Sequence, residues 1–340
     1  MNRKGFFNSR CRPAGNQRGV ALIVVLWIFM FLFVVAFDFS ADVREEANAA
    51  HRFSEDTRGY YLALAGFERG LYEYAMSGQS ATSQETETPP GFFDFNWHEE
   101  KLGNGTFRVR LIDEGGKINL NRVDEASLRT ILTNLGVDEP RRSTLVDSIL
   151  DWIDTDNLHR ASGAENDYYE SLSPPYTAKN GFFGTVEELL WVKGMTPELF
   201  FGPGGEGEAG TGADRRSGLG EIFTVDSPID RVNLRTASAE VINALLGIPL
   251  EKAGAFVEGR KKLSNSSIGD LLPLLGIGAA DAALRMFVFT NPSVISVEAE
   301  GSTTGSGLPR RLKGVVRVAG GQGGFEMVRW IDRADAPARN

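Results

Sequence analysis

The chain has 340 residues, an apolar content of 42% with 10% aromatic residues, and a formal net charge of -9. This composition excludes a disordered protein and supplies enough apolar surface for two domains of ordinary size. The charge is unevenly divided, because residues 1–19 carry five bases and no acid, so the chain without them falls from -9 to -14. The only cysteine, Cys11, lies in this basic segment, which excludes a disulfide framework.

An uninterrupted apolar segment of eighteen residues, 20–37, follows Gly19. As a helix it would extend about 27 Å, close to the thickness of a bilayer core. Because the bases before it favour a cytoplasmic N-terminus, we expect a single-pass membrane segment with the acidic body on the opposite side. A cleaved secretory signal is the alternative, but its apolar region is usually shorter and ends in a small-residue cleavage site, which the following DFSADVREE lacks.

The helical pattern continues beyond the apolar segment. No proline occurs between residues 39 and 76, and apolar or small residues recur every three or four positions. We therefore expect one helix over residues 20–77. Its first part is apolar all round, and its second part is amphipathic and can pack one face on a domain.

This N-terminus resembles the class III signal of type IV prepilins and type II secretion pseudopilins. The resemblance rests on a basic leader that ends in Gly19 and on an apolar half-helix that runs into an amphipathic half. It implies that prepilin peptidase removes residues 1–19 and methylates the new N-terminus, Val20. The fifth mature position, usually a glutamate that neutralises the terminal amine of a neighbouring subunit, is Val24, and this departure argues against a repeated fibre subunit.

The body of the chain combines strand and helix patterns. Two polar segments, residues 77–90 and 202–218, are typical of loops. Short alternating segments near the two ends of the body predict strands at residues 106–114, 293–301, 312–320 and 325–332. We expect an α+β fold, in which a pilin-like long helix joins an antiparallel sheet (residues 91–117 and 286–334) that carries an inserted all-helical domain (residues 118–285).

An internal repeat lies within the expected insertion. Residues 118–137 align with residues 232–248, and residues 183–195 align with residues 265–277. The distance from Asn119 to Gly194 is 75 positions and that from Asn233 to Gly276 is 43, so the first copy has 32 additional residues between its halves. The copies resemble helix-hairpin-helix or SAM-like units.

The second copy resembles competence-type DNA-binding modules, so a membrane-tethered DNA-binding protein is the rival hypothesis. In such modules the hairpin amides hold a phosphate and nearby bases add attraction. The charge of -14 and the acids Asp138 and Glu139 at the first hairpin argue against it. Arg260, Lys261 and Lys262 form one small basic cluster, which is more often a solvated helix end than a phosphate track.

The additional residues of the first copy are rich in acids. The stretch DWIDTDNLHRASGAENDYYESL has one base, Arg160, and six acids: Asp151, Asp154, Asp156, Glu165, Asp167 and Glu170. Asp147, Asp151 and Asp154 would share one face of a helix, where each like-charged pair costs roughly 0.2 to 0.5 kcal/mol. A solvated acidic loop over residues 151–182 is one reading, and a metal site that neutralises the acids is the other.

Hard oxygen ligands without cysteine favour calcium over zinc or copper, and His159 alone is weak support for zinc. The segment is not an EF-hand, because Leu158 and His159 occupy its fifth and sixth positions. We expect a structural calcium site of another type. Its expected ligands are Asp154, Asp156, Glu165 and Asp167, with Asp151 as a ligand or a support and Glu170 less favoured.

From Arg18 to Asp332, the chain resembles the type II secretion minor pseudopilin K family (general secretion pathway protein K). The resemblance rests on four features in combination: the leader without the fifth glutamate, the helix and sheet, the repeat, and the DWID...GAENDYY...PPY loop. This resemblance implies an inner-membrane protein with most of the chain in the periplasm. It also implies that the chain caps the pseudopilus tip with the minor pseudopilins I and J, initiates its assembly to support protein secretion, and binds calcium.

The sequence gives little support for an enzyme. The three histidines, His51, His98 and His159, are scattered, and neither a Ser/His/Asp motif nor a phosphate loop is apparent. Secreted substrates and partner-facing surfaces are not encoded in any motif that we recognise. We therefore expect a role in assembly, and we expect the acidic loop to stabilise the body.

Overall fold

The computed structural model describes residues 18–80, 96–202, 218–261, 265–278, 282–303, 309–319 and 324–332. Most of the leader (residues 1–17) and most of the two predicted polar loops lie outside these ranges. The chain divides into two compact units, with the division between Thr57 and Arg58.

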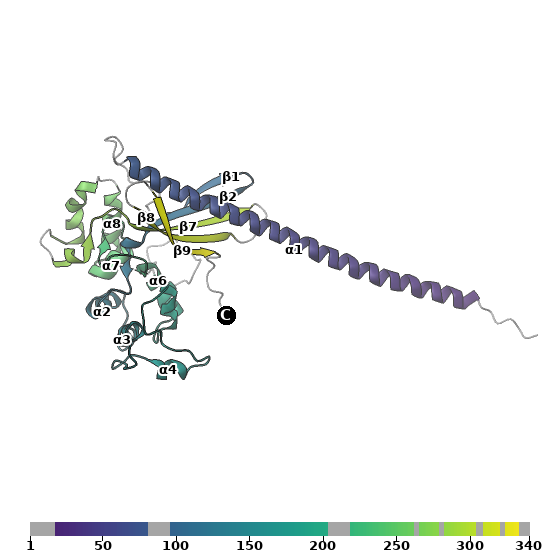
Figure 1. Cartoon of the computed structure of the whole chain (residues 1–340), viewed down its shortest axis with the longest axis horizontal. Helices are drawn as coiled ribbons and strands as arrows, with labels where there is room; N and C mark the ends of the chain where they lie inside the picture. Colours follow the sequence, from purple (N-terminus) through teal and green to yellow (C-terminus); the bar gives the residue numbers. More distant parts are fainter. Residues whose placement is uncertain are drawn as a thin grey trace, which may run out of the picture. The chain divides into compact units, whose positions relative to one another are not determined.

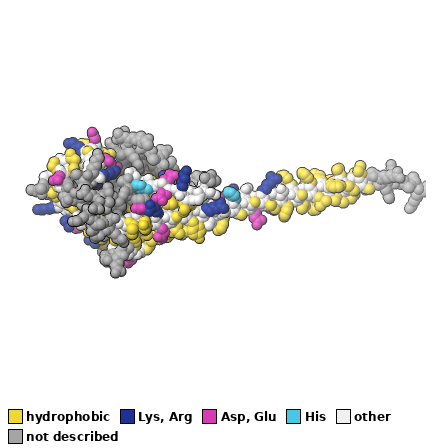
Figure 2. Space-filling model, turned by 90° about the horizontal axis from the view of Figure 1, so that it is seen from above, with side chains coloured by type: hydrophobic (Ala, Val, Ile, Leu, Met, Phe, Trp, Pro, Cys, Tyr) yellow, Lys and Arg dark blue, Asp and Glu magenta, His cyan; other side chains and the backbone are white. Residues whose placement is uncertain are grey.

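A single helix, α1 (Arg18–Ser80), forms the N-terminal part (Figure 1). This confirms the predicted long helix, which lacks any internal proline. Apolar side chains line its N-terminal part on the face that Figure 2 shows, and those from Val20 to Phe37 are exposed. Among the described residues, α1 is the one helix that is long and apolar enough to cross a membrane.

Five antiparallel strands form one sheet in the order β1-β2-β7-β8-β9. The strands are β1 (His98–Leu102), β2 (Gly105–Asp113), β7 (Val294–Thr303), β8 (Arg310–Ala319) and β9 (Gly324–Asp332). The last four coincide with the predicted strands. The edge strand β1 was not predicted, because its sequence HEEKL has almost no apolar alternation and owes its conformation to pairing with β2.

The second half of α1 packs on one face of this sheet. Alternate residues of β2, namely Phe107, Val109 and Leu111, are buried in a cluster with Leu62 and Phe67 of the helix. The helix approaches β7 closely because both sides carry small residues at the contact. A Cβ added to Gly301 would lie 2.1 Å from the Gly59 carbonyl oxygen and 2.4 Å from the Ala63 nitrogen.

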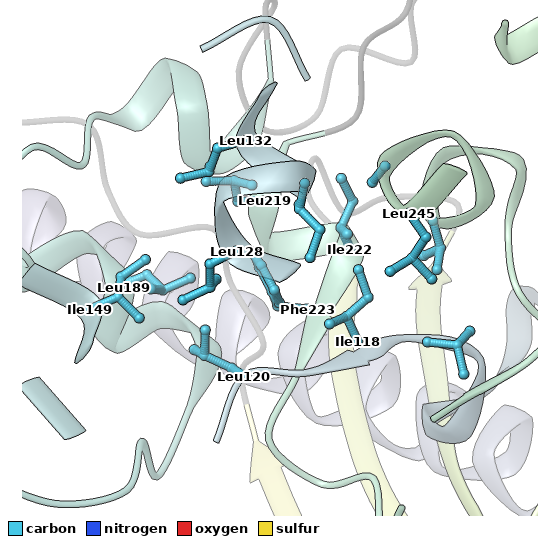
Figure 3. Packing of buried hydrophobic residues seen from close by; sticks show 14 of the residues in the cluster. Ile118, Leu120, Leu128, Leu132, Ile149, Leu189, Leu219, Ile222, Phe223 and Leu245 are labelled. Carbon is cyan, nitrogen blue, oxygen red and sulfur yellow. The ribbon is translucent and has the colours of Figure 1, made fainter. Parts of the chain in front are cut away.

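The chain between β2 and β7 is mainly helical and has its own apolar core, part of which Figure 3 shows. Its first half contains η1 (Glu114–Gly116), β3 (Ile118–Asn119), α2 (Glu125–Asn134), α3 (Arg141–Ile153), α4 (Asn166–Glu170), η2 (Val186–Trp191) and α5 (Pro197–Phe201). Its second half contains α6 (Leu219–Ile222), β4 (Phe223–Thr224), β5 (Val232–Asn233), α7 (Ala239–Leu246), α8 (Leu250–Arg260), η3 (Asn265–Leu275), η4 (Ala282–Met286) and β6 (Phe287–Val288).

The two aligned segments have closely similar local geometry. β3 pairs in parallel with β4, and β5 pairs in parallel with β6. In each, the leucine after the asparagine donates its backbone N–H to the partner strand, from Leu120 to Thr224 at 2.8 Å and from Leu234 to Val288 at 2.9 Å. A short helix follows each turn, α2 in one case and α7 in the other. Assignment of the two segments to the helix-hairpin-helix or SAM-like class stays a prediction.

Two adjacent carboxylates, Asp113 and Glu114, lie where β2 enters the helical region, and both are nearly fully buried. Gly115, two residues after Asp113, donates to it, and the other hydrogen-bond donors come from distant segments of the chain: Thr224, Asn233, Thr236 and Ser296. Lys117 also approaches Glu114, with 3.2 Å between Nζ and Oε1. These bonds tie the sheet to both halves of the helical region.

Candidate metal centre

The acidic loop is attached to the core by aromatic residues. Trp152 stacks on Phe183 with ring centroids 6.2 Å apart, and its edge meets the ring of Tyr169 at 5.3 Å. Tyr169 is fully buried. The anchors that precede and follow the acids are therefore fixed by packing, as expected from the sequence.

Asp151, in the last turn of α3, organises the loop around its own carboxylate. It is fully buried and accepts hydrogen bonds from the backbone N–H groups of Arg160 (3.1 Å) and Ala164 (3.0 Å) and from the Arg160 guanidinium (2.6 Å). A Cβ added to Gly163 would lie 1.8 Å from Asp151 Oδ2, so the loop can close around this side chain only with glycine there. Donors from the protein thus already occupy much of the hydrogen-bonding capacity of the Asp151 carboxylate.

Three carboxylates come together at the centre of the loop. Asp151, Asp154 and Glu165 each offer an oxygen, and these oxygens lie within 4.8 Å of one another. Asp154 follows the end of α3 and Glu165 precedes α4, so these two elements set their spacing. The group joins residues fourteen positions apart.

Three oxygens of this group, Asp154 Oδ1 and Glu165 Oε1 and Oε2, are buried and lack a hydrogen-bond partner among the described residues. The same holds for Asn180 Oδ1, elsewhere in the acidic loop. Buried polar atoms are normally satisfied, since an unpaired one costs about 1 to 3 kcal/mol and a charged one more. Glu165 is only 1% exposed and leaves both oxygens unpaired. Acceptor oxygens without donors at one place are what a bound cation requires.

The electrostatics also favour a divalent cation. Burial raises the pKa of Glu165, and the charges of Asp151 and Asp154 raise it further, to about 7. Arg160 is the base that contacts the group, with its NH1 atom 2.6 Å from Asp151 Oδ1 and 2.7 Å from Asp154 Oδ2. Three carboxylates and one guanidinium leave two negative charges, which a calcium ion would neutralise.

Two of the five expected ligands lie outside the three-carboxylate group. Asp156 Oδ1 accepts a bond from the Leu158 N–H at 2.8 Å, and Asp167 Oδ1 accepts one from the Tyr168 N–H at 2.8 Å. Both aspartates are exposed. They are near enough to raise the pKa of Glu165 through their charge, but their side chains cap local turns.

The remaining residues singled out in the acidic stretch lie away from the group. Glu170 is exposed, and His159 is exposed with its Nδ1 atom 3.1 Å from the Arg160 carbonyl oxygen. Neither residue belongs to the three-carboxylate group. A histidine ligand, which would have favoured zinc, is therefore not supported by this arrangement.

Asn180 was missed in the sequence. Its backbone has a positive φ of 48°, and its side-chain amide donates to the Asp156 carbonyl oxygen at 2.9 Å and to Asn157 Oδ1 at 3.1 Å. The unpaired Oδ1 atom is a neutral amide oxygen of the kind that calcium also binds. The only available signal was the Asn-Gly pair at 180–181, which indicates a turn and not a ligand.

Lys193, two residues after the end of η2, supports the same loop. Its ammonium group lies 2.9 Å from the Gly163 carbonyl oxygen and 4.8 Å from the centre of the Tyr168 ring. The backbone N–H of Lys193 donates to the Tyr169 hydroxyl at 3.2 Å. Lys193 therefore contacts the backbone and the aromatic residues of the loop, and not its acidic side chains.

The basic cluster of the second copy differs from the expected solvated helix end. Arg260 is buried, and its guanidinium donates to the Leu234 carbonyl oxygen at 2.8 Å. Burial lowers its pKa to about 10. Lys261 pairs with Glu258 at 2.8 Å, and Lys262 lies outside the described residues. Arg260 therefore serves the core and does not present its charge to a phosphate.

The chain was compared with known proteins. The family model described as "Type II secretion system (T2SS), protein K" matches residues 110–201, which contain the three-carboxylate group and Asn180. The type II secretion system protein K of Pseudomonas aeruginosa is 28% identical over 91% of this chain and 95% of that protein. The chain is thus similar to the type II secretion system protein K family over most of its length. Protein K of Pectobacterium carotovorum is 28% identical over 54% of this chain, and the match spans only 60% of that relative.

The fold agrees with this family. A chain of the GspK-GspI-GspJ complex from the type 2 secretion system of enterotoxigenic Escherichia coli superposes with a TM-score of 0.61, over 84% of this chain and 99% of that chain, at 16% identity. At that identity the likeness establishes the fold alone. The two chains therefore share an overall fold.

Proposed function

We propose that this protein K-family chain is a minor pseudopilin that caps the tip of the periplasmic pseudopilus and initiates its assembly with the minor pseudopilins I and J. The observation that carries the proposal is the relationship to protein K over 91% of the chain, combined with the fold of a chain from a GspK-GspI-GspJ complex. The role is mechanical and not enzymatic. The apolar part of α1 packs among neighbouring helices, while the bulky body hinders addition of a further subunit above it.

The N-terminus supports membrane anchoring and processing. Gly19 and Val20 lie in the first turns of α1, directly before the apolar residues, and Val20 is exposed. Cleavage after Gly19 would leave Val20 as a methylated N-terminus. The chain would then be a single-pass inner-membrane protein whose acidic body lies in the periplasm.

Calcium is proposed as a structural ion of the acidic loop. Asp154 and Glu165 offer unpaired oxygens, and Asn180 offers a neutral one. Asp151 would contribute an oxygen or hold the others in place, because it already accepts several protein hydrogen bonds. When bound, the ion supplies the positive charge that the carboxylates lack, and the chain's own residues hold the loop in the conformation that brings them together.

Membrane-tethered DNA binding is the less favoured function. The buried Arg260 removes one of the three bases that could attract a phosphate. The net charge of -14 without residues 1–19 also opposes a polyanion. The proposed helix-hairpin-helix or SAM-like units are in this view packing modules of the helical domain.

The test is coexpression of the tagged full-length chain with minor pseudopilins I and J from the same secretion system and with prepilin peptidase. After detergent extraction, we expect both partners to copurify with the chain in comparable amounts. A single-pass membrane protein with the same tag is the control for nonspecific recovery. Retention of neither partner would contradict the proposal.

A further inference from the structure

The face of the five-stranded sheet that points away from α1 carries a strip of basic side chains. Alternation along β2 places Arg108 and Arg110 opposite the apolar residues that contact the helix. Across β7, the strand β8 contributes Arg311 and Lys313 to the same face. We refer to Arg108, Arg110, Arg311 and Lys313 as the basic strip.

Two glutamates of the central strand neutralise only half of this charge. Glu298 is shared by Arg110 (2.6 Å) and Lys313 (3.3 Å). Glu300 is shared in the same way by the guanidiniums of Arg108 and Arg311. Among the described residues of the strip itself, four bases against two acids leave an excess of two positive charges. Near Lys313, Glu114 and Glu187 of the helical region reduce this excess, and Glu114 is also paired with Lys117.

The bases of the strip are more accessible than the acids. The Glu300 side chain is 4% exposed, whereas those of Arg108 and Arg311 are 42% and 35% exposed. The ring of Trp97 lies 4.7 Å from the guanidinium carbons of both Arg108 and Arg110, which stacks these groups and restricts their motion. An approaching molecule therefore meets preorganised cations first.

The strip continues toward the β1–β2 turn. A shallow hollow of about 370 Å³ there is lined by Lys101, Thr106 and Ser302, among others. Thr106 and Ser302 are the next residues on the same face after Arg108 and Glu300. Their hydroxyls are hydrogen-bonded to each other at 2.9 Å, which leaves one hydroxyl hydrogen for a further acceptor. Glu99, which is paired in register with Arg108, offsets the charge of Lys101, so these two residues do not change the net charge of the strip.

This excess is opposite in sign to the rest of the body, since the chain without residues 1–19 has a net charge of -14. Ion pairs that served only to stabilise the sheet would need equal numbers of acids and bases, and the strip has more bases than acids. We propose that the basic strip is a docking surface for an acidic segment of another protein. Complementary charge gives such contacts specificity and fast association.

The chemistry favours carboxylates over a nucleic-acid backbone. Glu298 and Glu300 lie in the middle of the strip and would repel a continuous row of phosphates. Separate carboxylates of a polypeptide can instead sit beside Arg108 or Arg311 and avoid the central acids. This inference does not depend on the proposed assembly function.

The test uses the full chain in detergent micelles and a fluorescein-labelled peptide of eight glutamates, with peptide binding followed by fluorescence anisotropy. A peptide of eight lysines and a single-stranded DNA oligonucleotide of eight nucleotides are the comparison probes. We expect the glutamate peptide to bind most tightly. Its affinity should fall as sodium chloride is raised from about 50 mM to about 500 mM, because salt screens exposed charges.

The informative variant is the double substitution Arg108→Gln with Arg110→Gln. It leaves Glu300 with Arg311 and Glu298 with Lys313, so neither buried glutamate loses its last base. We expect the glutamate peptide to bind about fivefold or more weakly, as two ion pairs of ordinary strength predict. The control, Arg122→Gln with Arg285→Gln, removes the same charge from exposed sites on the helical region and should leave binding unchanged.

Three results would overturn the proposal. The first is that the glutamate peptide shows no salt-sensitive binding to the wild type. The second is that the control variant loses as much binding as the Arg108/Arg110 variant, and the third is that DNA binds as tightly as the peptide. Circular dichroism melts of both variants show whether the fold is retained. If the Arg108/Arg110 variant unfolds, the single Arg108→Gln variant is measured instead, and unchanged peptide binding there contradicts the proposal.

Discussion

At the scale of single residues, the acids of the loop divide into two roles. The Asp151 carboxylate is occupied by hydrogen bonds from Arg160 and Ala164, and these bonds fix the conformation of the loop. The Glu165 carboxylate accepts no hydrogen bond among the described residues, and the residue is almost fully buried. A carboxylate in that state is destabilising unless it is protonated or bound to a cation.

Calcium should stabilise the full chain, and the stabilisation should depend on Glu165. At a calcium concentration about a hundred times its Kd, the ion adds about 2.7 kcal/mol to the free energy of unfolding. We expect EDTA to lower the Tm of the wild type, followed by tryptophan fluorescence, and added calcium to restore it. In Glu165→Gln the calcium-dependent rise should be lost, whereas the Tm in EDTA should not fall, because a buried charge has been removed.

The matched control is Asp156→Asn, an exposed acid of the same loop that lies outside the three-carboxylate group. It should retain most of the calcium-dependent rise in Tm. A wild-type Tm that responds to neither EDTA nor calcium would rule out the site. An equal loss of the calcium response in both variants would show that the loop's total charge, and not Glu165, holds the ion.

The candidate site was only partly predictable from residues. The excess of acids over the single base Arg160 indicated that a cation was needed, and this follows from composition alone. Whether Asp151 or Asp156 would face Glu165 depends on the end of α3 and on the close approach of Gly163, which no spacing rule encodes. Asn180 reaches the loop from 24 positions beyond Asp156 through tertiary packing, so its role was not visible in the sequence.

At the scale of elements, the contact between α1 and β7 depends on glycine. We expect Gly301→Ala to destabilise the fold by about 1 to 3 kcal/mol or more, since its Cβ would meet backbone atoms of Gly59 and Ala63 that cannot rotate away. Urea unfolding of the full chain measures the change. Gly254→Ala in α8 is the control: its Cβ meets nothing within 4 Å, and it should be neutral or stabilising.

The junction between sheet and helices should be sensitive to acid. Burial opposes ionisation of Glu114, but Lys117 and Lys313 together with the hydroxyl donors lower its pKa to about 2, from 4.5. A lowered pKa in the folded state means that the stabilisation is fully present above pH 4.5 and is lost as the pH falls toward 2. At pH 3 the loss from this one group is about 2 kcal/mol.

Glu114→Gln tests this assignment. The variant should be less stable than the wild type at pH 7, and the two free energies of unfolding should converge between pH 4.5 and 3, because the variant has no carboxylate to titrate there. Urea unfolding at each pH gives the comparison. Parallel curves for the two proteins would show that Glu114 does not carry the acid sensitivity.

Elements were predictable where the pattern is regular. The periodicity of α1 and the alternation of β2, β7, β8 and β9 come from one apolar face in each, which the sequence displays directly. Strand β1 lacks such a face and forms only because β2 offers it a pairing edge. The short strands β3 to β6 contain two residues each, and their parallel pairing joins segments far apart in the chain.

At the scale of the whole molecule, the chain combines a membrane-compatible helix with an acidic body of sheet and helices. The absence of glutamate at Val24 distinguishes its helix from that of a repeated fibre subunit, as the family resemblance implies. Its relationship to protein K spans both parts of the chain. An anchored subunit at one end of an assembly accounts for both features.

The central claim is that this chain is a processed pseudopilin, and the most direct measurement is the intact mass after coexpression with prepilin peptidase. The account predicts loss of residues 1–19 and a mature chain that begins at a methylated Val20. Replacing Gly19 by valine should leave the leader attached. A wild-type chain that keeps its first 19 residues in the presence of active peptidase would contradict the account.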